Sequence, residues 1–206
     1  MLCIVEESRV PRRQRIGAAT GIIAPIFAFT CILSAIASYP PFNWTNNALS
    51  DLGVISGITG PIFNFGLYSC GALALIFTLL GLFAYLGKNW VGKLGAAVFA
   101  AATIALVCIG IFNENFSPTH YFASVAFFVL MPISFFIITA AFGMQHQTKM
   151  AVFTILIGIV AAIPWILFFV VHYVSGVAIP EFISGLAGAV WIITLGYKIL
   201  EENKST

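Results

Sequence analysis

LGAAVFAAATIALVCIGIF, residues 94–112, is a run of nineteen residues without one charged side chain. About 20 mostly apolar residues in a helix cross the roughly 30 Å hydrocarbon core of a bilayer, so this run predicts a membrane-spanning helix. Similar runs occupy about 16–38, 59–86, 121–142, 150–174 and 182–200. The sequence therefore predicts an all-α, polytopic membrane protein, with six transmembrane helices bundled in a single domain over residues 1–206.

The composition excludes a soluble protein. Hydrophobic residues make up 61% of the chain and charged residues only 8%, whereas a soluble domain carries about 25% charged residues. The mean hydropathy is +1.05. A net charge of +2 is too small to indicate a nucleic-acid partner, so the expected surroundings are a lipid bilayer and the expected location is the cell membrane. The four cysteines form no CxxC pair, which argues against a disulfide framework or a cysteine zinc site.

Cations predict the orientation. Six crossings place all nine lysines and arginines on one side, which the positive-inside rule makes cytoplasmic together with both termini. They are Arg9, Arg12, Arg13, Arg15, Lys88, Lys93, Lys149, Lys198 and Lys204. An alternative is a signal peptide cleaved after Ala35-Ile36-Ala37, but the run 16–38 is longer than the roughly 7–15 residues of a signal-peptide core.

The opposite side carries titratable groups and no fixed cation. Its acids and imidazoles, with neighbouring polar side chains, are Asp51, Glu114, Glu181, His120, His172, Asn47 and Ser50. Because the three loops of a compact bundle meet over one mouth, we expect a polar site at the extracytoplasmic face. Ionisable residues close to the bilayer are costly enough to indicate function.

Three kinds of chemistry fit this group: a divalent metal such as zinc, general acid–base catalysis, and proton relay. The catalytic candidates are Asp51, His120, His172 and Glu181, the binding candidates Ser50, Asn47 and Glu114, and the metal candidates His120, His172 and Asp51. Structural roles are alternatives: Asp51 as a helix cap, Glu114 as a solvated loop residue, His120 as an interfacial residue near a helix start, and Glu181 as a partner of a helix dipole. His172 lies deeper in its apolar run, where an unpaired imidazole is less favourable.

Several stretches resemble the prokaryotic, largely archaeal membrane family called domain of unknown function 998. They are Asn46-Asn47-Ala48-Leu49-Ser50-Asp51-Leu52-Gly53, Phe63-Asn64, Pro118-Thr119-His120, and Ile179-Pro180-Glu181 running on to Trp191. The similarity covers essentially the whole chain. It implies a six-span protein and no established activity.

A more distant resemblance links Ser50, Asp51, His120 and His172 to membrane hydrolases that include alkaline ceramidases and hold zinc with a Ser, an Asp and three His. The paired histidines one helical turn apart are absent here, as is a third outer histidine. Glu114 or Glu181 would have to complete the metal site.

Three functions remain open, and with them the question of whether the chain is an enzyme. The first is a membrane protein without a catalytic role that binds a lipid or a partner. The second is a metal-dependent hydrolase acting on a lipid at the outer leaflet. The third is a small transporter or proton-coupled carrier, for which the spans offer no ionisable residue at mid-depth. Haem between His120 and His172 ranks below these. Asn43-Trp44-Thr45 matches a glycosylation sequon, and the oligomeric state is not indicated.

Overall fold

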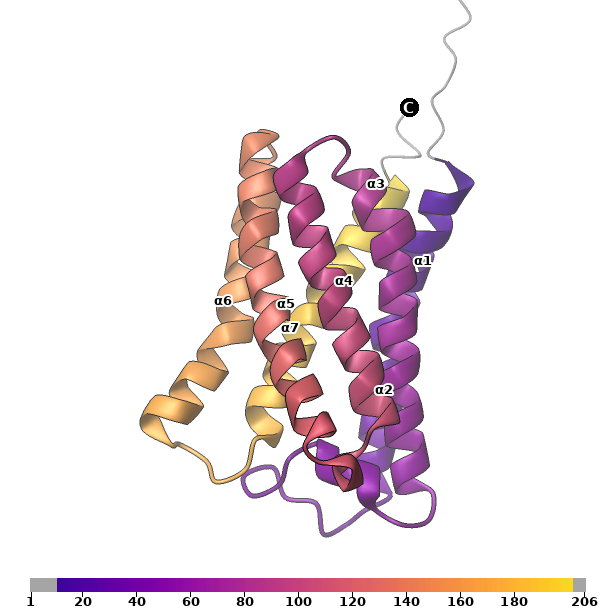
Figure 1. Cartoon of the computed structure of the whole chain (residues 1–206), viewed down its shortest axis with the longest axis vertical. Coiled ribbons are helices and arrows are strands. Elements are labelled where there is room, and N and C mark those ends of the chain that lie inside the picture. The colour runs from indigo at the N-terminus through magenta and orange to yellow at the C-terminus, as the bar shows by residue number, and fades with distance from the viewer. Residues whose placement is uncertain (1–10, 202–206) are drawn as a thin grey trace, which may run out of the picture.

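The computed structural model describes residues 11–201 as a bundle of long helices with no β-strand among these residues (Figure 1). Arg9, Lys204 and Cys3 lie outside the described residues. The helices are α1 (Arg12–Ala37), α2 (Thr59–Ile76), α3 (Phe83–Tyr85), α4 (Trp90–Ile111), α5 (Thr119–Met144), α6 (Thr148–Val171) and α7 (Ala178–Glu201). A π-helical segment, η2 (Phe77–Leu82), joins α2 to α3, and two 3₁₀ helices, η1 (Ser50–Val54) and η3 (Glu114–Phe116), lie in loops.

Six helices are long and apolar enough to cross a membrane, with Thr59–Tyr85 counted as one span. The predicted fold class is confirmed, and the boundaries differ by at most four residues at any helix end. The third span begins at Trp90 rather than at residue 94, because the Asn89 side chain accepts hydrogen bonds from the backbone N–H groups of Val91 and Gly92. Such a cap satisfies donors that the first turn leaves free, so the helix begins before the apolar run does.

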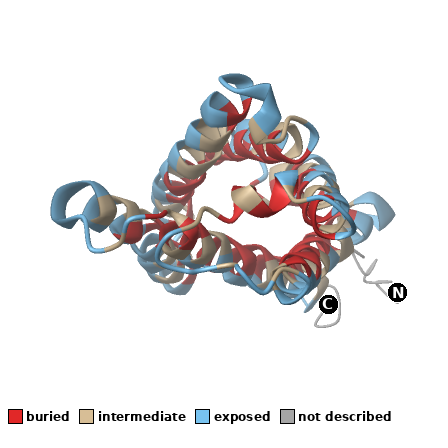
Figure 2. Ribbon diagram, turned by 90° about the horizontal axis from the view of Figure 1, so that it is seen from below, coloured by how far each residue is buried: buried red, intermediate tan, exposed pale blue. Residues whose placement is uncertain are grey.

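The long helices close into a ring. Each packs against the next along the chain (α1 on α2, α2 on α4, α4 on α5, α5 on α6, α6 on α7), and α7 returns to α1. Figure 2 shows this ring from below, with buried residues on its inner side. Close approach needs small residues: a Cβ at Gly17 of α1 would lie 2.5 Å from the backbone nitrogen of Gly81 in η2.

Aromatic side chains fill the middle of the ring. The Trp191 ring lies 5.2 Å from the Phe99 ring and 4.7 Å from the Phe135 ring, measured between centroids. The buried indole Nε1–H of Trp191 donates to Thr154 Oγ1 at 3.1 Å. This buried cluster joins α4, α5, α6 and α7.

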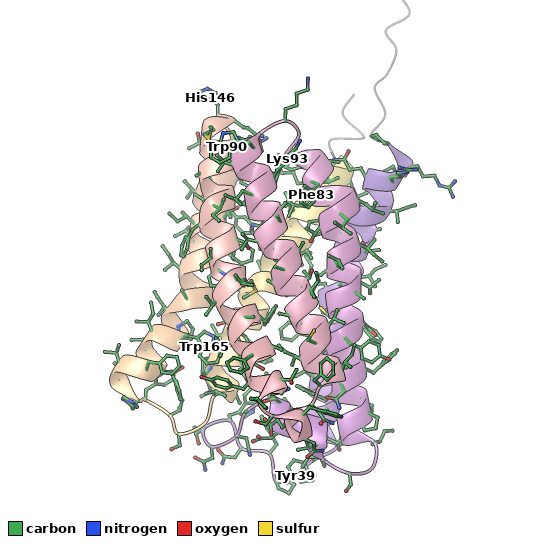
Figure 3. The ribbon with its side chains drawn as sticks, in the orientation of Figure 1. Tyr39, Phe83, Trp90, Lys93, His146 and Trp165 are labelled. Atoms are coloured by element: carbon green, nitrogen blue, oxygen red, sulfur yellow. The ribbon has the colours of Figure 1, made fainter. Side chains whose placement is uncertain are left out.

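The two ends differ in charge. One end, called the basic end, carries the described lysines and arginines; Figure 3 labels Lys93 and His146 there. The start of α1 and the end of α7 also lie at this end (Figure 1). The other end, called the loop end, is formed by the 38–58, 112–118 and 172–177 loops, and Figure 3 labels Tyr39 there. Every acid and imidazole that we expected at the extracytoplasmic face lies at the loop end.

Candidate functional site

The 38–58 loop is folded across the loop end and held there by the backbone. The N–H groups of Ser175 and Gly176 both donate to the carbonyl oxygen of Thr45, at 3.0 and 2.7 Å, and Ala178 N–H donates to Asn47 O at 2.9 Å. A Cβ on Gly176 would lie 2.4 Å from the backbone of Asn46. The loop before α7 and the 38–58 loop therefore form one packed layer.

Side chains from three other elements also hold this loop. Leu49 N–H donates to Glu181 Oε2 at 2.6 Å, and Ser50 Oγ–H donates to Glu114 Oε1 at 2.8 Å. Asn64 Nδ2 of α2 donates to the Gly53 carbonyl oxygen at 2.9 Å. Glu181 is only 8% exposed, and among residues 11–201 its carboxyl group accepts a hydrogen bond from Leu49 N–H.

Asp51 and Asn47 serve mainly their own loop. Asp51 Oδ2 accepts from Asn47 Nδ2 at 2.7 Å and from Ala48 N–H at 3.0 Å. Asn47 Oδ1 accepts from Asn43 N–H at 2.9 Å. Neither residue lines a cavity described below. Asp51 lies inside η1, which has no side-chain cap, so these bonds fold the loop rather than cap the helix.

His120, in the first turn of α5, is buried and oriented by one strong contact. Its Nδ1 lies 2.7 Å from the Phe112 carbonyl oxygen. Because a carbonyl oxygen only accepts, Nδ1 must carry a hydrogen, and in the neutral ring Nε2 is then an acceptor. Ser124 Oγ lies 3.4 Å from Nε2, a long distance for an O–H donor. His120 therefore presents an acceptor that Ser124 satisfies only weakly.

His172 lies apart from these groups. It ends α6 in a left-handed conformation (φ 53°) and is exposed. It lines neither cavity described here. Within residues 11–201, no group of three or more His, Cys, Asp or Glu side chains is arranged to hold a metal ion. The structure thus brings together Ser50, Glu114, His120 and Glu181, but not His172.

These four residues line a pocket that opens on the side of the bundle. Its volume is about 760 Å³. In Figure 1 the part of α6 nearest the loop end leans away from α5, beyond Pro164, which lies inside the helix. A proline removes a backbone hydrogen bond and kinks a helix. The apolar wall of this lateral pocket is formed by α5 and α6 residues: Val125, Phe128, Val129, Trp165, Phe168 and Phe169.

Trp165 brings an unpaired donor to the lateral pocket. Its indole Nε1–H is buried, and no hydrogen-bond partner for it exists among the described residues. Its ring lies 4.7 Å from the Phe128 ring between centroids, and Figure 3 labels it in the half of the bundle nearest the loop end. Buried donors are satisfied in most proteins, so this N–H is an exception among the described residues.

The electrostatic character of the lateral pocket is acidic. Two carboxyl groups, Glu114 and Glu181, line it, and no lysine or arginine of the described chain does. His120 Nε2 adds an acceptor. A molecule that complements this wall must bring hydrogen-bond donors and must not bring an anion.

Sequence reasoning missed Ser124 and Trp165. Both fall inside apolar runs, where a serine or a tryptophan is ordinary. An indication lay in the α5 spacing: Ser124 follows His120 by four residues, which places two polar side chains on one helix face. Nothing comparable marks Trp165.

A family model described as a protein of unknown function (DUF998) matches residues 22–198 of the chain. No curated protein and no solved structure matches this chain.

Proposed function

This chain belongs to the DUF998 family of proteins of unknown function, and we propose that it is an integral membrane protein that binds an amphiphilic molecule taken from the bilayer. The polar head lies against Ser50, Glu114, His120 and Glu181, and the apolar part lies between α5 and α6. The observation that carries this proposal is the lateral pocket, in which the buried Glu181 carboxyl group shares a wall with exposed apolar residues of α5 and α6.

The position of the pocket favours a ligand from the membrane over one from water. Its α5 and α6 walls are apolar and continue onto the outer surface of the bundle, where Tyr121 and Phe169 are more than half exposed. In a membrane protein such a surface faces lipid. A molecule entering sideways keeps its chain in an apolar environment while its head reaches the polar groups.

The headgroup that fits is neutral or cationic. The wall offers acceptors at Glu114, Glu181 and His120, and no lysine or arginine among residues 11–201 lines it to balance a phosphate. Hydroxyl and amine groups donate hydrogen bonds to carboxyl groups and to imidazole. The proposed ligand class is therefore an amphiphile with a hydroxyl- or amine-bearing head.

The proposed site faces the outside of the cell membrane. This follows from the positive-inside rule applied to the cations at the basic end, and it makes the outer leaflet the source of the ligand.

A bulky residue in the pocket wall is expected to block binding. Val125→Trp places an indole in the apolar wall between α5 and α6, so the protein purified in a mild detergent should retain less than a tenth of the amphiphile that the wild type retains. Solvent extraction followed by mass spectrometry measures the retained molecules and identifies their headgroups.

Ile133→Trp is the matched control. Ile133 lies two turns along the same helix, is 42% exposed where Val125 is 43% exposed, and lines neither cavity. The Ile133→Trp protein should retain as much amphiphile as the wild type does. Equal retention by both variants, or a wild-type protein that carries no amphiphile, would contradict the proposal.

A metal-dependent hydrolase is the second candidate. One observation favours it: histidines that ligate metals hold the other ring nitrogen in a hydrogen bond, as His120 Nδ1 is held by the Phe112 carbonyl oxygen.

Metal analysis of the purified protein separates the two candidates. For amphiphile binding alone we expect less than one tenth of a metal ion per chain after dialysis against zinc. A stoichiometric zinc ion that disappears in His120→Ala would favour the hydrolase instead.

A further inference from the structure

A second cavity lies inside the ring. Its volume is about 120 Å³, and its wall is almost entirely apolar. It begins beneath Leu49, Ser50 and Glu181 at the loop end and reaches Phe99 and Met131 in the middle of the bundle. Apolar cavities of about this size accept apolar molecules.

This interior cavity adjoins the lateral pocket. Four residues, Ser50, Ser124, Phe128 and Glu181, line both spaces. The polar end of the interior cavity is therefore the inner wall of the lateral pocket, and Glu181 lies where the two meet. One molecule could contact both spaces without leaving the polar group.

We infer that the interior cavity receives the end of the apolar chain of the amphiphile and so limits the chain length that the protein accepts. The inference rests on the proposed function. The chain passes Phe128 and Ser124 and ends against Phe99 and Met131, where the aromatic cluster around Trp191 closes the ring. A cavity of ~150 Å³ accepts the six carbon atoms of benzene, so this space of about 120 Å³ holds about five.

Chain length should therefore govern affinity. Each buried methylene contributes about fourfold to the binding constant until the cavity is full, and further methylenes contribute nothing there. The probes are 1-O-alkylglycerols with chains of 8 to 18 carbon atoms, because their ether bond resists hydrolysis and their head is an uncharged diol. Binding to the full chain in nanodiscs is measured by native mass spectrometry.

Gly185 offers a way to fill the cavity. It lines the space, and a Cβ at this position would meet only the end of the Phe29 ring, at 3.8 Å. Gly185→Leu is expected to lower the affinity for long-chain alkylglycerols at least tenfold while leaving the shortest chains within twofold of the wild type. Gly143→Leu is the control: a Cβ there has nothing within 4 Å, and Gly143 lines neither cavity.

The outcomes separate the two proposals. Unchanged chain-length dependence in a folded Gly185→Leu protein overturns the chain-end site and leaves amphiphile binding standing. Failure of the wild type to bind any of these alkylglycerols, or an alkylamine probe such as dodecylamine, overturns the proposed function itself. If Gly185→Leu does not fold, Gly185→Ala takes its place: its single methyl group fits beside Phe29 and should lower long-chain affinity about fourfold, and no change overturns the inference.

Discussion

Replacing Glu181 with alanine is expected to loosen the 38–58 loop and to abolish retention of the amphiphile. The substitution removes the acceptor of the 2.6 Å bond from Leu49 N–H, and Leu49 is buried. A buried donor left without a partner costs about 1–3 kcal/mol. The same change removes the carboxyl group at the junction of the two cavities, so loop and ligand respond together.

Hydrogen exchange and binding measure the two effects separately. We expect the Leu49 amide to exchange about tenfold or more faster in Glu181→Ala, since 1.4 kcal/mol corresponds to a factor of ten. Binding of 1-O-dodecylglycerol and of dodecylamine should fall below detection. Glu201→Ala, at the exposed opposite end of the same helix, should leave both measurements unchanged.

Glu181→Gln distinguishes the two effects. Its amide oxygen can still accept from Leu49 N–H, so the exchange rate of Leu49 should stay near that of the wild type. The affinity for dodecylglycerol should stay within about threefold of the wild-type value. The affinity for dodecylamine should fall more than tenfold, because its ammonium group pairs with this carboxyl group. Slow exchange at Leu49 in Glu181→Ala would show that the carboxyl group does not hold the loop.

Labelling with a membrane-impermeant thiol reagent is expected to give an all-or-none difference between the two ends. Ser175→Cys lies exposed in the loop before α7, and Lys88→Cys lies exposed between α3 and α4. In intact cells the reagent should modify Ser175→Cys completely and leave Lys88→Cys unmodified until the cells are permeabilised. Each lysine or arginine near an anionic leaflet contributes about 1 kcal/mol, so the cations at the basic end strongly favour one orientation.

The control for this experiment is the parent chain with Cys3 replaced by serine, because the other native cysteines lie in α1, α2 and α4. It should remain unmodified in intact cells. Labelling of Lys88→Cys from outside would show that the chain has the opposite orientation, and the proposed ligand would then come from the cytoplasmic leaflet.

The spans were predictable because a membrane helix satisfies its backbone hydrogen bonds within itself. Whether residues 94–112 cross a bilayer therefore depends on their own composition. The start of the third span was predicted at residue 94 instead of Trp90 for a local reason. The Asn89 cap acts through hydrogen bonds to the backbone, which a count of apolar residues does not detect. The loops that carry the acids and histidines could also be predicted to lie at one end. Successive spans cross the membrane in alternate directions, so every second loop lies on the same side.

Which of these residues line the lateral pocket was not predictable in the same way. Asp51 and His172 carry the same kinds of group as Glu181 and His120, yet Asp51 is engaged by Asn47 and Ala48 in its own loop. His172 ends a helix that leans outward beyond Pro164. Residue type and loop position do not tell which side chain turns inward.

The amino-acid sequence alone determined the number of spans, their order and the common side of the cations, since each depends on short stretches of chain and on charge. The folded ring alone decided that Glu181 binds Leu49, 132 residues away, and that Ser50 binds Glu114, 64 residues away. It also decided that the bend of α6 opens the bundle sideways. Contacts between distant segments arise from packing, so only the tertiary structure brings the acidic wall of the lateral pocket and the apolar cavity together.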